Sequence, residues 1–253
     1  MCILFIAINQ HKDYPLIIAA NRDEFHQRPT KSAYFWPAPA EILAGQDLQA
    51  NGTWLGLNKQ GDFSALTNIR SALTLNVDAK SRGELVQLAL QQPELINQQW
   101  LIQNSQHYNP FNLVYTQDKN LYCFNSSTSD HTLLTDGFHA ICNGAMDDVW
   151  PKMAKGEILL EQLISEQQEL HSEHLFAIMQ DPTQAPDELL PETGVGLEWE
   201  RKLSSIFIKS SEYGTRSTAV ILKHQSGSTD FYEQSYTSNA EIFNKKQFAL
   251  ARQ

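Results

Sequence analysis

Apolar residues in the first part of the chain fall in short runs that are separated by polar turns. The runs Cys2–Ile8 and Leu16–Ala20 flank a polar turn that ends at Pro15. Apolar runs of this length between turn signals are typical of β-strands, so we predict a hairpin here. The runs Thr53–Asn58 and Phe63–Thr67 flank another polar turn and predict a second hairpin.

The apolar pattern changes to a helical spacing in the middle of the chain. Between Ser81 and Gln106 the apolar residues recur at helical intervals, interrupted by Pro93. Because proline breaks the hydrogen bonding inside a helix, we predict two helices that are joined at this residue. A second helical pattern covers Lys152–Ile164 and Glu173–Gln180.

The remaining segments complete a block order of strands, helices, strands, helices and strands. The proline-rich segment Phe25–Ala40 predicts an irregular loop, because proline disrupts the ladder of a sheet. Further apolar runs predict strands over Phe111–Thr116, Leu121–Asn125, His139–Asn143, Ser205–Lys209, Thr215–His224 and Thr229–Gln234. Segregated blocks favour an α+β fold with antiparallel sheets and helices packed outside them. With no linker or internal repeat, we expect a single domain over residues 2–253.

Composition narrows the classes of partner. The 253 residues include 19 Lys and Arg against 29 Asp and Glu, which gives a net charge of −10. This acidic balance argues against nucleic acid as a partner. No apolar run approaches the length of about 18 residues that a membrane-spanning helix needs. The apolar start of the chain is interrupted at Asn9, too early for a signal peptide, so we expect a cytoplasmic protein.

Cys2 is the residue with the clearest chemical potential. Initiator methionine is generally removed when the second residue is as small as cysteine. Cys2 would then carry a thiol beside an α-amino group, whose ordinary pKa of about 7.7–8.0 suits it to act as a base. The alternative is a small apolar residue that begins a buried strand. The other two cysteines, Cys123 and Cys142, lie in strand patterns and indicate core thiols.

A polar tetrad, Asn21-Arg22-Asp23-Glu24, follows the second predicted strand. Pairing of the first two strands as a hairpin brings this tetrad close to Cys2. Arginine beside a thiol favours the thiolate, and an aspartate can hold and orient an α-ammonium group. The alternative is a polar turn after a strand.

Several motifs together resemble the NRDE family, also called the transport and Golgi organisation family. They are Met-Cys-Ile-Leu at the start, the Asn21–Glu24 tetrad, Asn51-Gly52-Thr53-Trp54-Leu55-Gly56, Leu66-Thr67-Asn68-Ile69-Arg70, Asn143 with Trp150-Pro151-Lys152, Glu198-Trp199-Glu200 and Tyr213-Gly214-Thr215-Arg216-Ser217. Their combined order covers nearly the whole chain.

The NRDE family in turn resembles N-terminal-nucleophile hydrolases of the bile-salt hydrolase and penicillin V acylase type. That resemblance implies a four-layer αββα sandwich of two antiparallel sheets flanked by helices, and cleavage of a non-peptide C–N amide bond. It matches Cys2 to the nucleophile and Arg22 and Asp23 to two site residues. In those hydrolases the two residues are separated, whereas here they are adjacent. Adjacent strand residues face opposite sides of a sheet, so both serve one site only if they lie past the strand's end.

The same resemblance adds three further site residues. Asn68 and Asn143 resemble asparagines whose side chains help to bind a tetrahedral oxyanion. Arg216 resembles an arginine that assists thiolate formation or binds an acidic group. For both asparagines the alternative is an ordinary turn or strand-end residue.

Two functions stay open at this stage. The first is an amidase in which Cys2 forms a thioester with a small-molecule amide substrate. The second is a non-catalytic binding or trafficking protein for a lipid, acyl or haem-like ligand, which the adjacency of Arg22 and Asp23 favours. The eight histidines lack H-x-x-x-H spacing, and no phosphate or dinucleotide loop is present, so we expect no metal and no cofactor. The sequence leaves the oligomeric state and the substrate undetermined.

Overall fold

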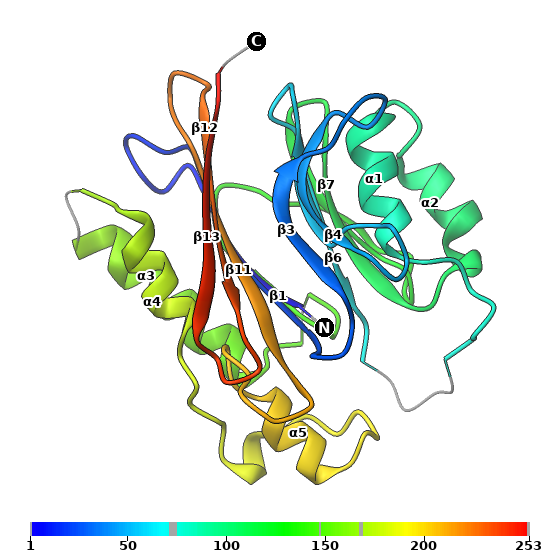
Figure 1. The fold of residues 1–253 in the computed structure, drawn as a ribbon, viewed down its shortest axis with the longest axis vertical. Helices are drawn as coiled ribbons and strands as arrows, with labels where there is room; N and C mark the ends of the chain where they lie inside the picture. Colours follow the sequence, from blue (N-terminus) through cyan, green and yellow to red (C-terminus); the bar gives the residue numbers. More distant parts are fainter. Residues whose placement is uncertain (1, 71–74, 147, 167–168, 252–253) are drawn as a thin grey trace. The chain divides into compact units, whose positions relative to one another are not determined.

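The fold is built on two antiparallel β-sheets (Figure 1). The structure is a computed structural model, which describes residues 2–70, 75–146, 148–166 and 169–251. These residues form two compact units, each assembled from segments far apart in the sequence. The first unit holds the described residues up to Gln27, Arg70 and Asp136–Ala251, and the second holds Arg28–Ile69 and residues 75–135. A single domain over residues 2–253 stays a prediction.

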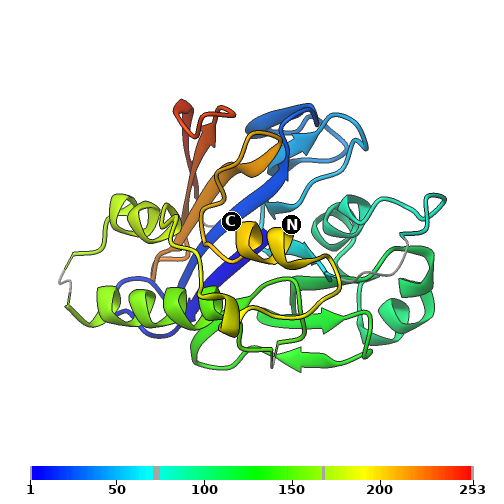
Figure 2. The same cartoon turned by 90° about the horizontal axis from the view of Figure 1, so that it is seen from below.

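The first unit contains a six-stranded sheet in the order β10-β1-β2-β11-β12-β13. Its strands are β1 (Cys2–Ile8), β2 (Leu16–Phe25), β10 (Gly137–Ile141), β11 (Tyr213–Lys223), β12 (Thr229–Tyr236) and β13 (Ile242–Leu250). The helices of this unit are α3 (Pro151–Glu166), α4 (Ser172–Met179) and the short α5 (Leu197–Leu203), with a 3₁₀ turn at Asp187–Leu189. Helices α3 and α4 lie side by side against one face of this sheet (Figures 1 and 2).

The core of the first unit shows which side chains face those helices. Ile3, Phe5 and Ala7 of β1 belong to one apolar cluster with Met153 of α3 and Leu175 of α4. Side chains of a strand alternate between its two faces. The even-numbered residues of β1, which begin with Cys2, therefore point to the face opposite the helices.

The second unit contains a seven-stranded sheet in the order β3-β4-β5-β6-β7-β8-β9. Its strands are β3 (Thr30–Phe35), β4 (Ile42–Asp47), β5 (Leu55–Asn58), β6 (Phe63–Asn68), β7 (Phe111–Gln117), β8 (Asn120–Asn125) and β9 (His131–Leu133). Its helices are α1 (Gly83–Gln91) and α2 (Gln98–Asn104), followed by a 3₁₀ turn at Ser105–His107. Leu85 and Leu90 of α1 pack with Phe111 and Phe124 of the sheet in a second apolar cluster.

The predicted class is confirmed: two antiparallel sheets are flanked by helices in an α+β fold. The hairpins and the helix break at Pro93 are confirmed as well. The order of four stacked layers stays a prediction. No helix within the described residues is both long and apolar enough to cross a bilayer.

The prediction of an irregular loop over Phe25–Ala40 is wrong. Strand β3 occupies Thr30–Phe35 at the edge of its sheet, with a register shift between Lys31 and Tyr34. Pro29 and Pro37 lie just outside the strand, where the missing N–H group of proline costs no ladder hydrogen bond. The proline density therefore marks the ends of an edge strand.

The prediction of a strand over Ser205–Lys209 is also wrong. Helix α5 precedes this segment, which forms no strand apart from one isolated bridge between Lys209 and Gly214. Its apolar residues Ile206 and Ile208 are buried in two different clusters, so their burial does not depend on a ladder. Strands β4, β9 and β13 were not predicted.

Candidate functional site

Strand β2 continues through the polar tetrad to Phe25, so the prediction that it ends at Ala20 is wrong and Arg22 and Asp23 lie within the strand. Buried partners make this possible. The side-chain amide of Asn21 donates to the carbonyl oxygens of Met179 at 2.8 Å and Ile206 at 2.9 Å. Because the polar groups find hydrogen bonds inside the fold, the strand does not have to stop where the apolar run ends.

The register of β1 with β2 places Cys2 directly opposite Arg22 in the first sheet. Cys2 of β1 is the direct partner of Arg22 of β2, and Arg22 is in turn the partner of Ser217 of β11. Directly opposed residues present their side chains on the same face, and neighbouring strands lie about 4.7–4.9 Å apart. Cys2, Arg22 and Ser217 therefore form a row on the face opposite α3 and α4, and all three are buried.

Asn143 lies just after the end of β10, the strand that flanks β1 on the side away from β2. The pairing of β1 with β10 ends at Leu4 and Ile141, and Asn143 follows Ile141 by two residues. Asn143 is fully buried. Its Oδ1 atom accepts a hydrogen bond from the Cys142 thiol at 3.2 Å, and its carbonyl oxygen accepts one from the Arg70 N–H at 2.6 Å.

Arg216 lies beside the row, at an irregularity in strand β11. The register of β11 with β2 shifts between Thr215 and Ser217, which makes Arg216 the extra residue. Its Nη1 atom donates to the carbonyl oxygen of Phe25 at 2.8 Å. Burial lowers the pKa of Arg216, and the charge of Arg22 lowers it further, so the two guanidinium groups act on each other.

Asp23 faces the side of the sheet that α3 and α4 cover. Its Oδ1 atom accepts a hydrogen bond from the Thr215 hydroxyl at 2.7 Å, and its carbonyl oxygen accepts one from the Tyr213 hydroxyl at 2.9 Å. Burial raises the pKa of Asp23, whereas the charges of Lys152 and Arg70 and the bond from Thr215 lower it. Asp23 and Arg22 are thus separated by the sheet itself.

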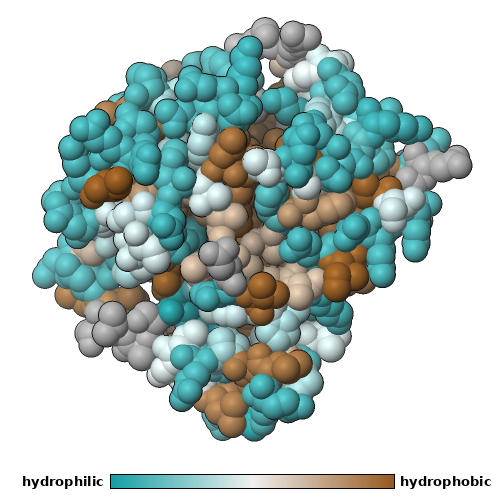
Figure 3. Space-filling model, turned by 180° about the vertical axis from the view of Figure 1, so that it is seen from behind, coloured by the Kyte–Doolittle hydropathy of each residue, from teal (hydrophilic) through white to brown (hydrophobic). Residues whose placement is uncertain are grey.

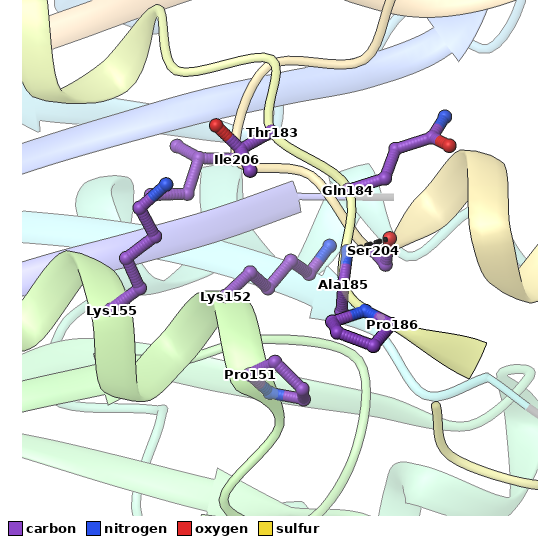
Figure 4. Close-up of a pocket in the computed structure, with 9 residues that line it drawn as sticks. All are labelled: Pro151, Lys152, Lys155, Thr183, Gln184, Ala185, Pro186, Ser204 and Ile206. Atoms are coloured by element: carbon purple, nitrogen blue, oxygen red, sulfur yellow. Dashed lines mark hydrogen bonds between the residues drawn. The ribbon is translucent and has the colours of Figure 1, made fainter. Parts of the chain in front are cut away.

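Lys152, whose charge acts on Asp23, also lines a small pocket (Figure 4). The pocket has a volume of about 170 Å³ and is lined by residues of α3, of the segment 183–186, and by Ser204 and Ile206. Lys152 is buried, and its Nζ atom donates to the carbonyl oxygen of Leu203 at 2.8 Å. The neighbouring Lys155 is ion-paired with Asp181. This pocket lies on the helix side, away from the face that carries Cys2.

Burial is the largest influence on the pKa of the Cys2 thiol, and it raises this pKa. The charge of Asp23 also raises the pKa. The charge of Arg22 and a hydrogen bond from the Asp23 backbone lower it. The net pKa is raised, so this thiol needs a base beside it to become a nucleophile.

Asn68 lies in the second unit. It ends β6 in the second unit, where its strand partner is Phe111. Its role stays a prediction. Among the residues that the structure describes, no cluster of three or more His, Cys, Asp or Glu side chains has the arrangement of a metal site.

Two buried charged residues near the site, Arg70 and Lys152, lie within motifs whose sequence indicates no role for them. Arg70 follows strand β6 and Lys152 follows Trp150-Pro151, and both are buried. A single charged residue next to apolar or aromatic residues is the sequence signal for a buried charge. Such a residue is rarely buried without a partner, so it also indicates a partner elsewhere in the chain. Their partners lie far along the chain, so sequence spacing did not reveal them.

Asp23 is expected to make the folded state more stable as the pH is lowered. Its folded pKa lies above the unfolded value of about 3.9, so between these two values the folded state binds more protons. The contribution of Asp23 to the free energy of unfolding is therefore full below the unfolded pKa. It is lost as the pH rises through the folded pKa. We expect the melting temperature of the wild type relative to Asp23→Asn to increase as pH is lowered from 7 to 4.

Asp187→Asn is the matched control for this titration. Asp187 is exposed, and its hydrogen bond to Arg201 lowers its pKa, so its contribution changes with pH in the opposite direction. A wild-type advantage over Asp23→Asn that shrinks toward acid pH would contradict the raised pKa.

Known proteins resemble this chain over most of its length. The family model described as "Transport and Golgi organisation 2" matches residues 1–238. The human transport and Golgi organization protein 2 homolog is 32% identical, with 93% of each chain covered. The mouse homolog is 30% identical with the same coverage, and the Drosophila melanogaster protein is 26% identical over 94% of this chain and 93% of its own. The resemblance inferred from the motifs is confirmed.

A solved structure also aligns with this chain. It is that of the Caenorhabditis elegans N-acylethanolamine-hydrolyzing acid amidase ortholog, with a TM-score of 0.41 and 10% sequence identity. The alignment covers 87% of this chain and 92% of the other.

Proposed function

This chain belongs to the transport and Golgi organisation 2 family, and we propose that it hydrolyses a non-peptide C–N amide bond with Cys2 as the nucleophile. The observation that carries this proposal is the buried pair Cys2 and Arg22 on neighbouring strands, with the buried Asn143 just after the end of β10 on the other side of β1. An amide, a thiol and a guanidinium in this arrangement supply an oxyanion donor, a nucleophile and a positive charge. The substrate class is a small acylated amine or a peptide-like amide.

The proposed reaction begins with removal of Met1. The α-amino group of Cys2 then takes the proton of the thiol, and the thiolate attacks the carbonyl carbon of the amide. The side-chain amide of Asn143 donates to the oxyanion of the tetrahedral intermediate. When the C–N bond breaks, the α-ammonium returns the proton to the leaving amine and a thioester remains. Water attacks the thioester, which releases the acid and restores the thiol.

Arg22 and Asp23 have separate tasks in this proposal. Arg22 faces the same side as the thiol and favours its ionised form. The α-amino group belongs to the backbone, which lies between the two faces of the sheet. Asp23 can therefore hold that group from the helix side while Arg22 acts on the sulfur from the other side. Adjacent residues then serve one nucleophile although they point in opposite directions.

Asn143→Ala tests the oxyanion role. Loss of one oxyanion donor costs about 10²–10³-fold in kcat, so we expect a loss of this size with little change in KM. The measurement is the initial rate of hydrolysis over a panel of short-chain acyl amides and thioesters. Asn239→Ala, at an exposed turn of the same unit, is the control and should retain the wild-type rate. Equal rates for Asn143→Ala and Asn239→Ala would exclude Asn143 as an oxyanion donor.

A second candidate function, binding of a lipid, acyl or haem-like ligand without catalysis, is favoured by an aromatic cluster beside Arg216. Phe25 is 48% exposed and packs edge-to-face on Tyr213 at 5.1 Å and Trp199 at 6.4 Å. Apolar atoms also gather at the lower end of Figure 3, the end at which α5 lies in Figure 1. An apolar ligand with an acidic group would suit Phe25 and Arg216. Fatty-acid-induced thermal shifts that persist in Cys2→Ala, without hydrolysis by the wild type, would favour this function.

A further inference from the structure

Arg70 is a buried residue that contacts the backbone of the candidate site directly. Its N–H group donates to the carbonyl oxygen of Asn143 at 2.6 Å, one of the short hydrogen bonds of the first unit. Asn143 follows the end of β10, where the ladder with β1 has stopped. This bond therefore replaces a ladder hydrogen bond in fixing the chain at Asn143.

The backbone of Arg70 contacts Asn143, whereas its side chain is held by Glu200. The Nη1 atom of Arg70 is ion-paired with Glu200 Oε2, and both side chains are almost wholly buried. The other oxygen of Glu200 accepts hydrogen bonds from the Thr193 N–H at 3.2 Å and the Thr193 hydroxyl at 2.5 Å. Glu200 is thus held in one orientation by three donors, and it holds Arg70 in turn.

An aromatic ring completes the surroundings of the guanidinium group. The Cζ atom of Arg70 lies 4.6 Å from the centre of the Trp150 ring, over its face. Trp150 directly precedes α3, and Glu200 lies in α5. Arg70 therefore connects the strand end at Asn143 to the start of α3 and to the middle of α5.

The energetics argue that this ion pair does more than stabilise the fold. Buried ion pairs lose their hydration, and apolar residues of similar size often stabilise a protein as well or better. Here Nε and Nη2 of Arg70 are buried and have no hydrogen-bond partner among the described residues. An arrangement that leaves donors unsatisfied is a costly way to gain stability alone.

We propose that Arg70 and Glu200 are positioning residues that fix Asn143 beside Cys2. This inference rests on the proposed function for its catalytic meaning, because Asn143 is there the oxyanion donor. The ion pair fixes the Arg70 side chain, and the backbone N–H of Arg70 fixes the Asn143 carbonyl. The Asn143 side chain is thereby held beside the Cys2 thiol.

The test reads the position of Asn143 without relying on activity. The side-chain amide resonances of Asn143 are assigned in a ¹H–¹⁵N NMR spectrum by their absence in Asn143→Ala. They are then followed in Arg70→Met, in Glu200→Gln, which keeps an acceptor for Thr193, and in Arg70→Lys. Arg201→Met is the control, because it removes an exposed ion pair with Asp187 on the same helix as Glu200.

We expect the Asn143 resonances to move or broaden in Arg70→Met and Glu200→Gln, to recover partly in Arg70→Lys and to stay unchanged in Arg201→Met. The side-chain amide of Asn21, bonded to the carbonyl oxygens of Met179 and Ile206 in the first unit, reports that this unit is folded in each variant. Should Arg70→Met fail to fold, Glu200→Gln decides the question. Unmoved Asn143 resonances in a folded variant that lacks the ion pair would overturn the proposal.

The same variants separate this inference from the proposed function. Misplacement of a catalytic group by about 1 Å costs up to about 100-fold in rate, so hydrolysis by Glu200→Gln should fall toward that extent through kcat and not through KM. A wild type without hydrolysis, combined with shifted Asn143 resonances, would remove the catalytic meaning and leave the positioning intact. An active wild type, combined with Asn143 resonances that do not shift in the folded variants, would refute the positioning alone.

Discussion

Cys2→Ala is expected to lower amide hydrolysis by about 10³-fold or more, the largest effect of any single substitution in this protein. The variant keeps the small apolar character that the start of β1 requires but removes the sulfur that attacks the carbonyl. Arg22, the strand partner of Cys2, carries a guanidinium group, which cannot replace the thiol as a nucleophile. The measurement is the initial rate over the panel of acyl amides and thioesters.

Cys123→Ala is the matched control for this prediction. Cys123 is a buried thiol of β8 in the second unit, and burial raises its pKa to about 12. Removing it should leave the rate within a few-fold of the wild type, because this thiol stays protonated at neutral pH. If Cys2→Ala hydrolysed the panel as fast as Cys123→Ala, the catalytic function would be refuted, and ligand binding would be the function to pursue.

Gly156→Val is expected to give the largest loss of stability. Gly156 lies in α3, where it faces the ring of Phe5, and a Cβ atom at this position would lie 2.0 Å from Phe5 Cζ. The ring cannot move away freely, because it is 1% exposed within the core of the first unit. Overpacking of a core costs about 1–3 kcal/mol, so we expect a loss of about 2–3 kcal/mol and a fall of about 5–10 °C in melting temperature.

Glu161→Val separates this steric effect from helix propensity. Glu161 is exposed on the same helix, so its replacement introduces the same β-branched side chain without a clash. Its melting temperature should stay within about 2 °C of the wild type. A similar decrease in both variants would mean that α3 does not depend on the close approach of Gly156 to Phe5.

The part of the site that depends on local pairing could be predicted from the sequence. Two apolar runs joined by a polar turn fixed the hairpin of β1 and β2, and the hairpin brings Cys2 opposite Arg22. The antiparallel sheets followed from the block order of strands and helices. Local pairing of this kind needs only run lengths and turn signals, which the chain displays openly.

The part that depends on distant partners could not be predicted. The polar residues Asn21 and Asp23 predict that β2 ends at Ala20. Their partners, such as Met179 and Thr215, lie far along the chain and allow the strand to continue. Strand β13 was missed for a related reason. It is an edge strand with mostly exposed side chains, so its sequence lacks the apolar signal of a buried strand.

Arg70 illustrates the same limit for the candidate site. The sequence marks it only as a charge after an apolar strand, whereas its importance arises from Asn143, Trp150 and Glu200. These contacts join residues 73 to 130 positions apart in the chain. Sequence spacing therefore predicts neighbours within a hairpin but not the buried ion pair that supports them.

Mass spectrometry of the wild type tests the central claim most directly. The protein is incubated with a short-chain acyl thioester at pH 7, and its intact mass and N-terminal peptide are recorded over time. We predict a chain that begins at Cys2, carries one acyl group on that residue and loses the group again as water hydrolyses the thioester. A retained Met1, or an N-terminal peptide that never gains the acyl mass, would contradict the account.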